Sequence, residues 1–201
     1  RDLAPFFLVV IIVPLLLVLW KYQSFRPAHL LAITRETQEI SRKDYLLTQF
    51  NVCVTYFRLL VWPVNQNLDY DYPISHHLLE PGTFFSLLLL AGLLLLAVWL
   101  VSRERLVSFG IFFFILGLSA ESSFYPLEDV IFEHRLYLPM AGFSIVLPAL
   151  FGHLLKTPRG LTVFFLTLLS LFSVATVRRN EVWKDPVTLW EDTVRKSPQK
   201  P

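Results

Sequence analysis

The sequence predicts an all-α protein, a polytopic bundle of five to six transmembrane helices followed by a polar tail with one more helix. The 201 residues are 54% hydrophobic, whereas ordinary soluble domains are roughly 45–50% apolar. Residues 83–101 form nineteen consecutive positions without a charge, and a membrane-spanning helix needs about 20 apolar residues. We therefore expect an integral membrane protein with a transmembrane domain at residues 1–178.

The N-terminal part contains one predicted span and one polar segment. Leu3 to Trp20 is an apolar run of eighteen residues, and Lys21 to Lys43 carries five Lys and Arg residues. Prolines inside such a run are tolerated because neighbouring groups satisfy the freed carbonyls. The chain begins at Arg1 rather than Met and becomes apolar at once, so we expect further protein to precede it.

The segment from Asp44 to Trp62 has two interpretations. Its polar residues recur at spacings of three and four, which places them on one face of a helix. They are Asp44, Thr48, Asn51, Thr55 and Arg58. A helix of this kind either lies in the membrane interface or spans the membrane while lining a polar cavity. Pro63 is expected to end it.

Three later runs complete the predicted bundle together with residues 83–101. Residues 136–155 and 161–177 are long enough to span. Residues 107–120 would extend only about 21 Å at 1.5 Å per residue, so this helix must continue to about Tyr125 to cross. In the tail, Asp185 is a good N-cap, Pro186 suits the first helical position, and Ser197-Pro198 ends the helix.

Loop charges predict the orientation. The short turns at 102–106 and 156–159 carry four Lys and Arg residues, whereas the loops at 64–82 and 120–137 carry one against seven carboxylates. Basic loops stay in the cytoplasm, so both acidic loops and the tail are expected to be extracytoplasmic. Arg178-Arg179 breaks this pattern locally.

The main candidate site is the run Glu133-His134-Arg135-Leu-Tyr137-Leu-Pro, which adjoins an apolar span. Arg135 and His134 are candidates to bind a lipid phosphate, because guanidinium groups can hold phosphate oxygens through two parallel bonds. Glu133 would orient the arginine or a sugar hydroxyl, or form a salt bridge within the loop. Tyr137 is either a hydrogen-bond donor to the headgroup or an aromatic residue of the membrane interface.

Three other residues are weaker candidates for substrate contact. Arg58, on the polar stripe, is a second phosphate candidate, and its alternative role is to reach the membrane surface from a helix end. Asp69 and Asp71 could bind an acceptor or a divalent cation, Mg²⁺ or Mn²⁺. Acidic outer loops also arise simply because Lys and Arg are retained inside. No cofactor is otherwise indicated, and no basic stripe with interleaved aromatics suggests nucleic acid.

Three stretches together resemble a known group: residues 65–73 followed by Pro81, the run at 133–139, and Trp183 with residues 189–198. They are similar to bacterial polytopic tetratricopeptide-repeat membrane proteins and, through them, to the transmembrane-and-tetratricopeptide-repeat O-mannosyltransferases of GT-C fold. The resemblance implies that residues 179–201 are the linker and first helix of a repeat domain. It also implies a bacterial inner-membrane location.

The function implied by the resemblance is transfer of a sugar from a polyprenyl-phosphate donor to a protein acceptor on the extracytoplasmic face. The family's catalytic carboxylate lies in the first extracytoplasmic loop, which this chain lacks, so no catalytic residue is assigned and the chain alone is not expected to be active. One alternative is a non-catalytic anchor that presents repeats to an extracytoplasmic assembly and binds its partner through them. Another is a transporter of lipid-linked sugars, which the apolar runs at 83–101 and 161–177 disfavour.

Overall fold

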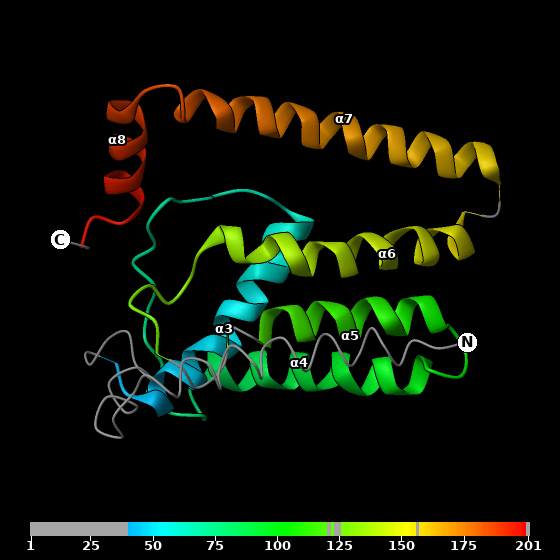
Figure 1. The fold of residues 1–201 in the computed structure, drawn as a ribbon, viewed down its shortest axis with the longest axis horizontal. Coiled ribbons are helices and arrows are strands. Elements are labelled where there is room, and N and C mark those ends of the chain that lie inside the picture. The colour runs from blue at the N-terminus through cyan, green and yellow to red at the C-terminus, as the bar shows by residue number, and fades with distance from the viewer. Residues whose placement is uncertain (1–39, 120–121, 123–125, 156, 200–201) are drawn as a thin grey trace, which may run out of the picture.

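The computed structural model describes residues 40–119, 122, 126–155 and 157–199. The predicted span at 3–20 and most of the polar segment at 21–43 lie outside these residues. The described part forms six α-helices and a short 3-10 turn, η1, with no strand (Figure 1). They are α3 (Arg42–Val61), α4 (Pro81–Leu100), α5 (Arg105–Ser119), η1 (Glu133–Leu136), α6 (Tyr137–Leu154), α7 (Pro158–Val182) and α8 (Pro186–Lys196).

Three helical segments of the described chain are long and apolar enough to cross a membrane. They are α4, the segment Glu133–Gly152 that joins η1 to α6, and α7. Each matches an apolar run found in the sequence, and α7 continues past Val177 through one further polar turn. The expectation of a membrane helix bundle is therefore confirmed in this coarse form.

The helix α5 is shorter than the sequence argument required. It ends at Ser119, a length of about 22 Å, although the Ser122 N–H still donates to the Leu118 carbonyl at 2.8 Å. Most of the predicted continuation to Tyr125 lies outside the described residues. The C-terminal end of α5 is covered by protein, because Phe114 and Leu118 pack in one buried cluster with Tyr56 of α3 and Ile131.

Small residues bring α4, α5 and α6 close together. A Cβ atom added at Gly142 would lie 2.5 Å from the Gly110 carbonyl oxygen and 2.8 Å from the Phe114 nitrogen. Close backbone approach at glycine is the usual way in which membrane helices pack, since lipid supplies no hydrophobic driving force between them. The Ser108 hydroxyl also donates to the Ala97 carbonyl, linking α5 to α4 at 2.8 Å.

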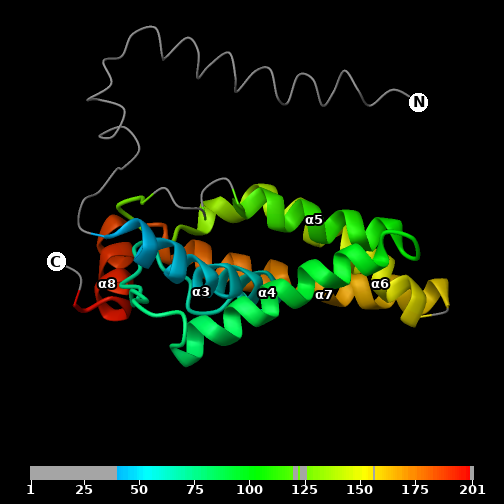
Figure 2. The ribbon, with the colours of Figure 1, turned by 90° about the horizontal axis from the view of Figure 1, so that it is seen from below.

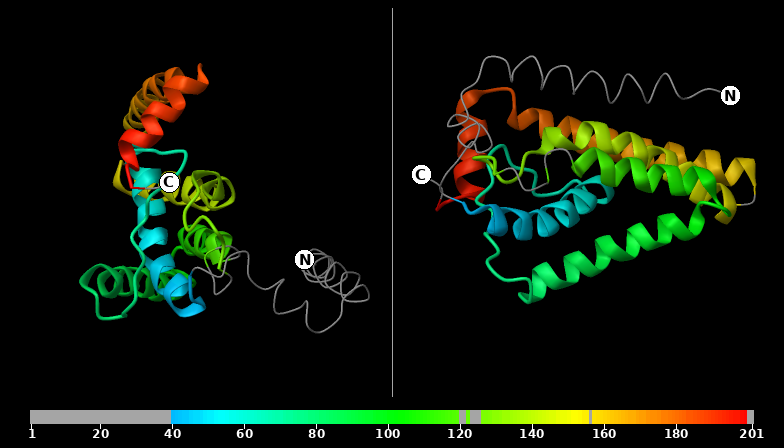
Figure 3. Two further views of the ribbon diagram at one scale, coloured as in Figure 1. Left: turned by 90° about the vertical axis from the view of Figure 1, so that its left-hand side faces the viewer. Right: turned by 60° about the horizontal axis from the view of Figure 1, so that its bottom comes forward.

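The helix α3 runs across one end of the bundle rather than alongside the other helices (Figures 1 and 3). Its polar stripe faces the segment that follows it. Asn51 donates to the hydroxyls of Ser75 (2.9 Å) and Thr83 (3.1 Å) and accepts from Ser86, and Thr55 is bonded to the Tyr72 hydroxyl. The stripe therefore holds a loop and the start of α4 in place, and Asn51 and Thr55 line a small cavity of about 370 Å³ that they share with this loop.

The helix α7 differs from the others in its packing. None of its residues, all of which the structure describes, is buried. A short turn joins it to α6, and Phe151 of α6 stacks on Phe164 of α7 at 4.2 Å between ring centroids. The two helices are seen apart in Figure 1 and overlap in the view of Figure 2. The segments predicted to be extracytoplasmic, 64–80 and 126–132, lie with α8 at the other end of α7.

Candidate functional site

A groove opens between α6 and α7 at the end where the loops gather. Its volume is about 520 Å³. We call it the α6–α7 groove, and its walls come from the end of α3 and the loop after it, from η1 and the start of α6, and from the last turns of α7. The lining residues are Leu59, Leu60, Pro63, Gln66, Asn67, Leu68, Phe132, Glu133, His134, Leu136, Tyr137, Met140, Phe172, Ala175, Thr176, Arg179, Asn180 and Trp183.

A tight turn after α3 sets one wall of the groove. Asn65 has a φ of 55°, a left-handed conformation that asparagine tolerates better than most residues. Arg58 donates from Nη1 to the Val64 carbonyl at 3.0 Å and so holds this turn. Arg58 is not among the lining residues, so the structure places this predicted phosphate ligand on the turn behind the groove.

Glu133 lies in the groove wall and is fixed by two donors. Its Oε1 accepts from the Asn67 backbone N–H at 2.8 Å and from the Tyr70 hydroxyl at 2.6 Å. Burial, together with the nearby Glu133 carboxylate, raises the pKa of Tyr70 above its ordinary value, so the phenol stays a donor. Within the described residues Oε2 of Glu133 makes no hydrogen bond, so it can accept from a ligand hydroxyl.

His134 and Tyr137 also line the groove, and both are exposed. The His134 ring lies against Phe132, with centroids 5.0 Å apart, and Tyr137 is 75% exposed at the first residue of α6. Three of the four predicted residues of the 133–137 run therefore face one cavity. This is consistent with the expectation that the run contacts a ligand.

Arg135 is oriented differently from its neighbours. Its guanidinium donates to the carbonyls of Asp129 at 3.1 Å and Val130 at 3.3 Å, and it lies 5.3 Å from the Phe132 ring. It is not a lining residue of the α6–α7 groove. The structure places the Arg135 guanidinium on the loop before η1, where Val130 and Ile131 are buried.

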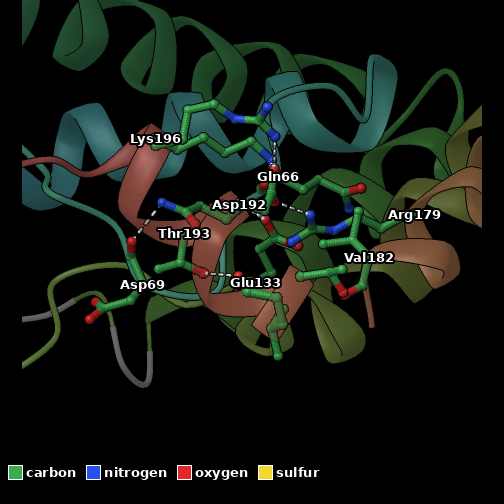
Figure 4. Close-up of polar contacts among 12 residues, drawn as sticks. Gln66, Asp69, Glu133, Arg179, Val182, Asp192, Thr193 and Lys196 are labelled. Atoms are coloured by element: carbon green, nitrogen blue, oxygen red, sulfur yellow. Dashed lines mark hydrogen bonds and ion pairs between the residues drawn. The ribbon is translucent and has the colours of Figure 1, made fainter. Parts of the chain in front are cut away.

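Asp69 and Asp71 meet the tail through their backbone atoms. The Ser197 hydroxyl donates to the Asp69 carbonyl (2.8 Å) and accepts from the Asp71 N–H (3.0 Å) and from Asn67 Nδ2 (2.8 Å). We call these four residues the tail clasp. Lys196 adds a bond to the Gln66 carbonyl at 2.7 Å, so the first acidic loop holds the end of α8 beside the groove (Figure 4).

Arg179, in the groove wall, is bonded to α8. Its Nη1 lies 2.7 Å from Asp192 Oδ2, which also accepts from Lys196 Nζ at 2.6 Å, and Asp192 Oδ1 accepts from Arg195 at 3.2 Å (Figure 4). Burial alone would raise the pKa of Asp192, but the bonds from Lys196 and Arg179 outweigh it and lower that pKa to about 2. One ionised carboxylate thus faces three cations.

Three groove residues were not predicted from the sequence: Arg179, Asn180 and Trp183. Their positions follow from the extension of α7 beyond the predicted span, which turns them toward η1. One signal was present: Arg178-Arg179 violates the loop-charge pattern at the predicted outer end of a span, and such residues are often retained for a partner or ligand. Within α8, Lys196 pairs with Asp192 at a spacing of four residues and Arg195 pairs with Asp192 at a spacing of three.

Asp69 and Asp71 were expected to bind a divalent cation, but the described residues provide no cluster of metal ligands around them. The described part of the chain contains no group of three or more His, Cys, Asp or Glu side chains that could hold a metal ion. Asp71 is exposed, and the bonds that join the two residues to Asn67 and Ser197 use the Asp69 carbonyl and the Asp71 N–H. Magnesium and manganese favour several oxygen ligands in a defined geometry, so two neighbouring carboxylates alone make a poor site.

No protein-family model, curated protein or solved structure matches this chain. The family resemblance therefore rests on the sequence motifs alone.

The lining of the groove is divided in character. One part is apolar, with Leu59, Leu60, Leu136, Met140 and Phe172. The other part offers a carboxylate, an imidazole, a guanidinium, three amides and the Trp183 indole. A cavity that combines an apolar wall with a few convergent polar groups suits a ligand that has both an apolar and a polar part. The polar part faces the loops, and the apolar part continues along the membrane helices.

Proposed function

We propose that this chain is the C-terminal membrane part of a glycosyltransferase of GT-C type, and that the α6–α7 groove is its lipid-donor site. The donor is a polyprenyl-phosphate sugar, and the acceptor is a protein on the extracytoplasmic face. The observation that carries the proposal is the groove itself, an amphiphilic cavity between two apolar helices where the Glu133–Tyr137 run meets the end of α7.

The groove fits such a donor in three respects. Its apolar residues continue onto α6 and α7, whose exposed leucines and phenylalanines suit a lipid chain. Its polar residues include Glu133 and Asn180, which are acceptors and donors of the kind that sugar hydroxyls need. Trp183 adds an aromatic face. Glu133 holds the substrate in this proposal, and the catalytic carboxylate is supplied by protein upstream of this chain.

The orientation follows from the same proposal. The acidic segments at 64–80 and 126–132 lie with α8 at one end of the bundle, which we place outside the bacterial inner membrane. We propose that α3 lies in the interface at this face, because it runs across the bundle and is not among the helices apolar enough to span.

A groove-filling substitution tests this function in the full-length protein. Ala175 lines the groove from α7, so Ala175→Trp should block the cavity and lower sugar transfer from a polyprenyl-phosphate donor at least about tenfold. Val174→Trp is the matched control, since Val174 is 54% exposed and is not a groove residue. If both variants fold and have equal activity, the groove takes no part in sugar transfer.

A second candidate function is a membrane anchor that presents tetratricopeptide repeats to an assembly. It is favoured by the outer face of α8, where Val187, Trp190 and Val194 are each more than half exposed (61%, 56% and 62%). The tail clasp would fix this face relative to the membrane. Retention of a bound partner together with absence of any sugar transfer would favour the anchor over the enzyme.

A further inference from the structure

We propose that Arg179 and Lys196 form a phosphate-binding site at the outer mouth of the α6–α7 groove, for the phosphate of a single-chain lipid, and that Asp192 occupies this site when no ligand is bound. The proposal deepens the proposed function and rests on its claim that the groove holds a lipid-linked donor. It differs from the sequence expectation, which assigned the phosphate to Arg135, His134 and Arg58.

The position of Asp192 marks where an anion binds. A single oxygen, Oδ2, lies 2.7 Å from Arg179 Nη1 and 2.6 Å from Lys196 Nζ. Two cations converge on this point from different elements, α7 and the last turn of α8. A phosphate oxygen placed there would receive the same two charge-assisted bonds, which are the stronger kind of hydrogen bond.

The cations that bind Asp192 are the ones that a phosphate in its place would meet. Three cationic side chains, Arg179, Arg195 and Lys196, share the carboxylate of Asp192. The nearest groove carboxylate, Glu133, is directed to Asn67 and Tyr70. Glu181 and Glu191 line the neighbouring pocket together with Asp192 and Arg195. Arg179 and Lys196 are therefore the cations that a phosphate would meet.

Arg179 is the member of the cluster that faces the groove. Its side chain is 16% exposed, it is a lining residue, and its guanidinium lies 5.9 Å from the Trp183 ring. Within the described chain it donates one hydrogen bond, to Asp192, although a guanidinium has five N–H donors. Its remaining donors can reach a headgroup whose chain lies along Phe172 and Met140.

The geometry implies competition between the ligand and α8 for Arg179. Asp192 belongs to α8, so a phosphate that takes its place loosens one of the contacts that hold this helix. The tail clasp at Ser197 does not involve Arg179 and keeps the end of α8 attached. Removing the Asp192 charge should then strengthen phosphate binding. A substitution that only disturbed the structure would weaken binding instead.

Binding of farnesyl phosphate to the full-length protein in nanodiscs, followed by calorimetry, tests the site. Arg179→Gln should weaken binding at least about tenfold, and Asp192→Asn should strengthen it. Arg178→Gln is the matched control, because Arg178 is the adjacent, exposed arginine outside the groove, and it should leave affinity unchanged. Equal effects of the Arg178 and Arg179 variants, or none, would overturn the proposal.

A measurement on the unmodified protein covers the case in which the variants do not fold. Farnesyl phosphate should protect Arg179 from modification by phenylglyoxal, and farnesol should not. Protection by inorganic phosphate at equal concentration would keep the anion site but overturn its assignment to a lipid. Absence of protection by either phosphate would overturn the site itself.

The outcomes separate this inference from the proposed function. Binding that depends on Arg179 with no sugar transfer by the full-length protein would contradict the transferase and leave the phosphate site standing. Sugar transfer that Ala175→Trp abolishes and Arg179→Gln leaves unchanged would retain the transferase and contradict the phosphate site.

Discussion

The helices α5 and α7 are both apolar, yet the structure uses them in opposite ways. Six residues of α5 are buried, and a glycine of this helix lies against the backbone of α6. None of the residues of α7 is buried, although α7 is ten residues longer (25 against 15). Both helices are apolar in composition, whereas small residues at the right positions decide which helix packs tightly. The loosely packed helix is the one that borders the groove.

The largest effect is expected where α5 meets α6. In Gly142→Leu the new side chain would meet backbone atoms of Gly110 and Phe114, which cannot move aside. We expect a loss of about 3 kcal/mol or more in the free energy of unfolding. Ser173→Leu on α7 is the control, because Ser173 is exposed on the open helix and leucine suits lipid there. Thermal unfolding in nanodiscs measures both, and equal stability of the two would remove the contrast between α5 and α7.

A smaller effect is expected at Arg135. Its bonds to the Asp129 and Val130 carbonyls hold the loop that covers the packed half of the bundle. Arg135→Gln should lower the free energy of unfolding by about 1–3 kcal/mol and leave the affinity for farnesyl phosphate within about twofold. Calorimetric binding on the folded variant checks this. A large loss of affinity without loss of stability would restore Arg135 as a phosphate ligand, as the sequence suggested.

The smallest effect concerns the docking of α8 as the pH changes. The pKa of Asp192 is lowered from 3.8 to about 2, so the ionised form is the one that stabilises the docked helix. This stabilisation is complete at a pH above the ordinary aspartate pKa of 3.8 and is lost as the pH falls toward 2.

Spin labels at the exposed positions Val194 and Leu79 report the docking. The distribution of distances between the two labels should stay constant from pH 8 to pH 5 and broaden below about pH 4. Asp192→Asn should remove this pH dependence. Opening of α8 near neutral pH would contradict the role given to Asp192.

Much of the fold could be predicted because the length of an apolar run can be read directly from consecutive residues. The spans α4, α6 and α7 appear as uninterrupted runs, and Asp185, Pro186 and Ser197 mark the ends of α8 where the structure has them. The path of α3 could not be predicted. Its polar stripe was visible, but its partners Ser75 and Ser86 lie 24 and 35 residues away, and periodicity does not identify such partners.

The site was predictable in part for the same reason. Glu133, His134 and Tyr137 line the groove, whereas Arg135, between them, turns to the Asp129 carbonyl. The direction of one long side chain depends on acceptors that only the folded loop provides. Arg179 was missed because its meeting with Asp192 depends on how far α7 extends and on where α8 folds back.

The most direct test is a structure of the full-length protein with a bound polyprenyl phosphate. We expect the phosphate at the outer mouth of the α6–α7 groove, within hydrogen-bond distance of Arg179, with the chain between α6 and α7 and Asp192 displaced. A phosphate bound on another face, with Arg179 still paired to Asp192 and the groove filled by protein, would contradict the account.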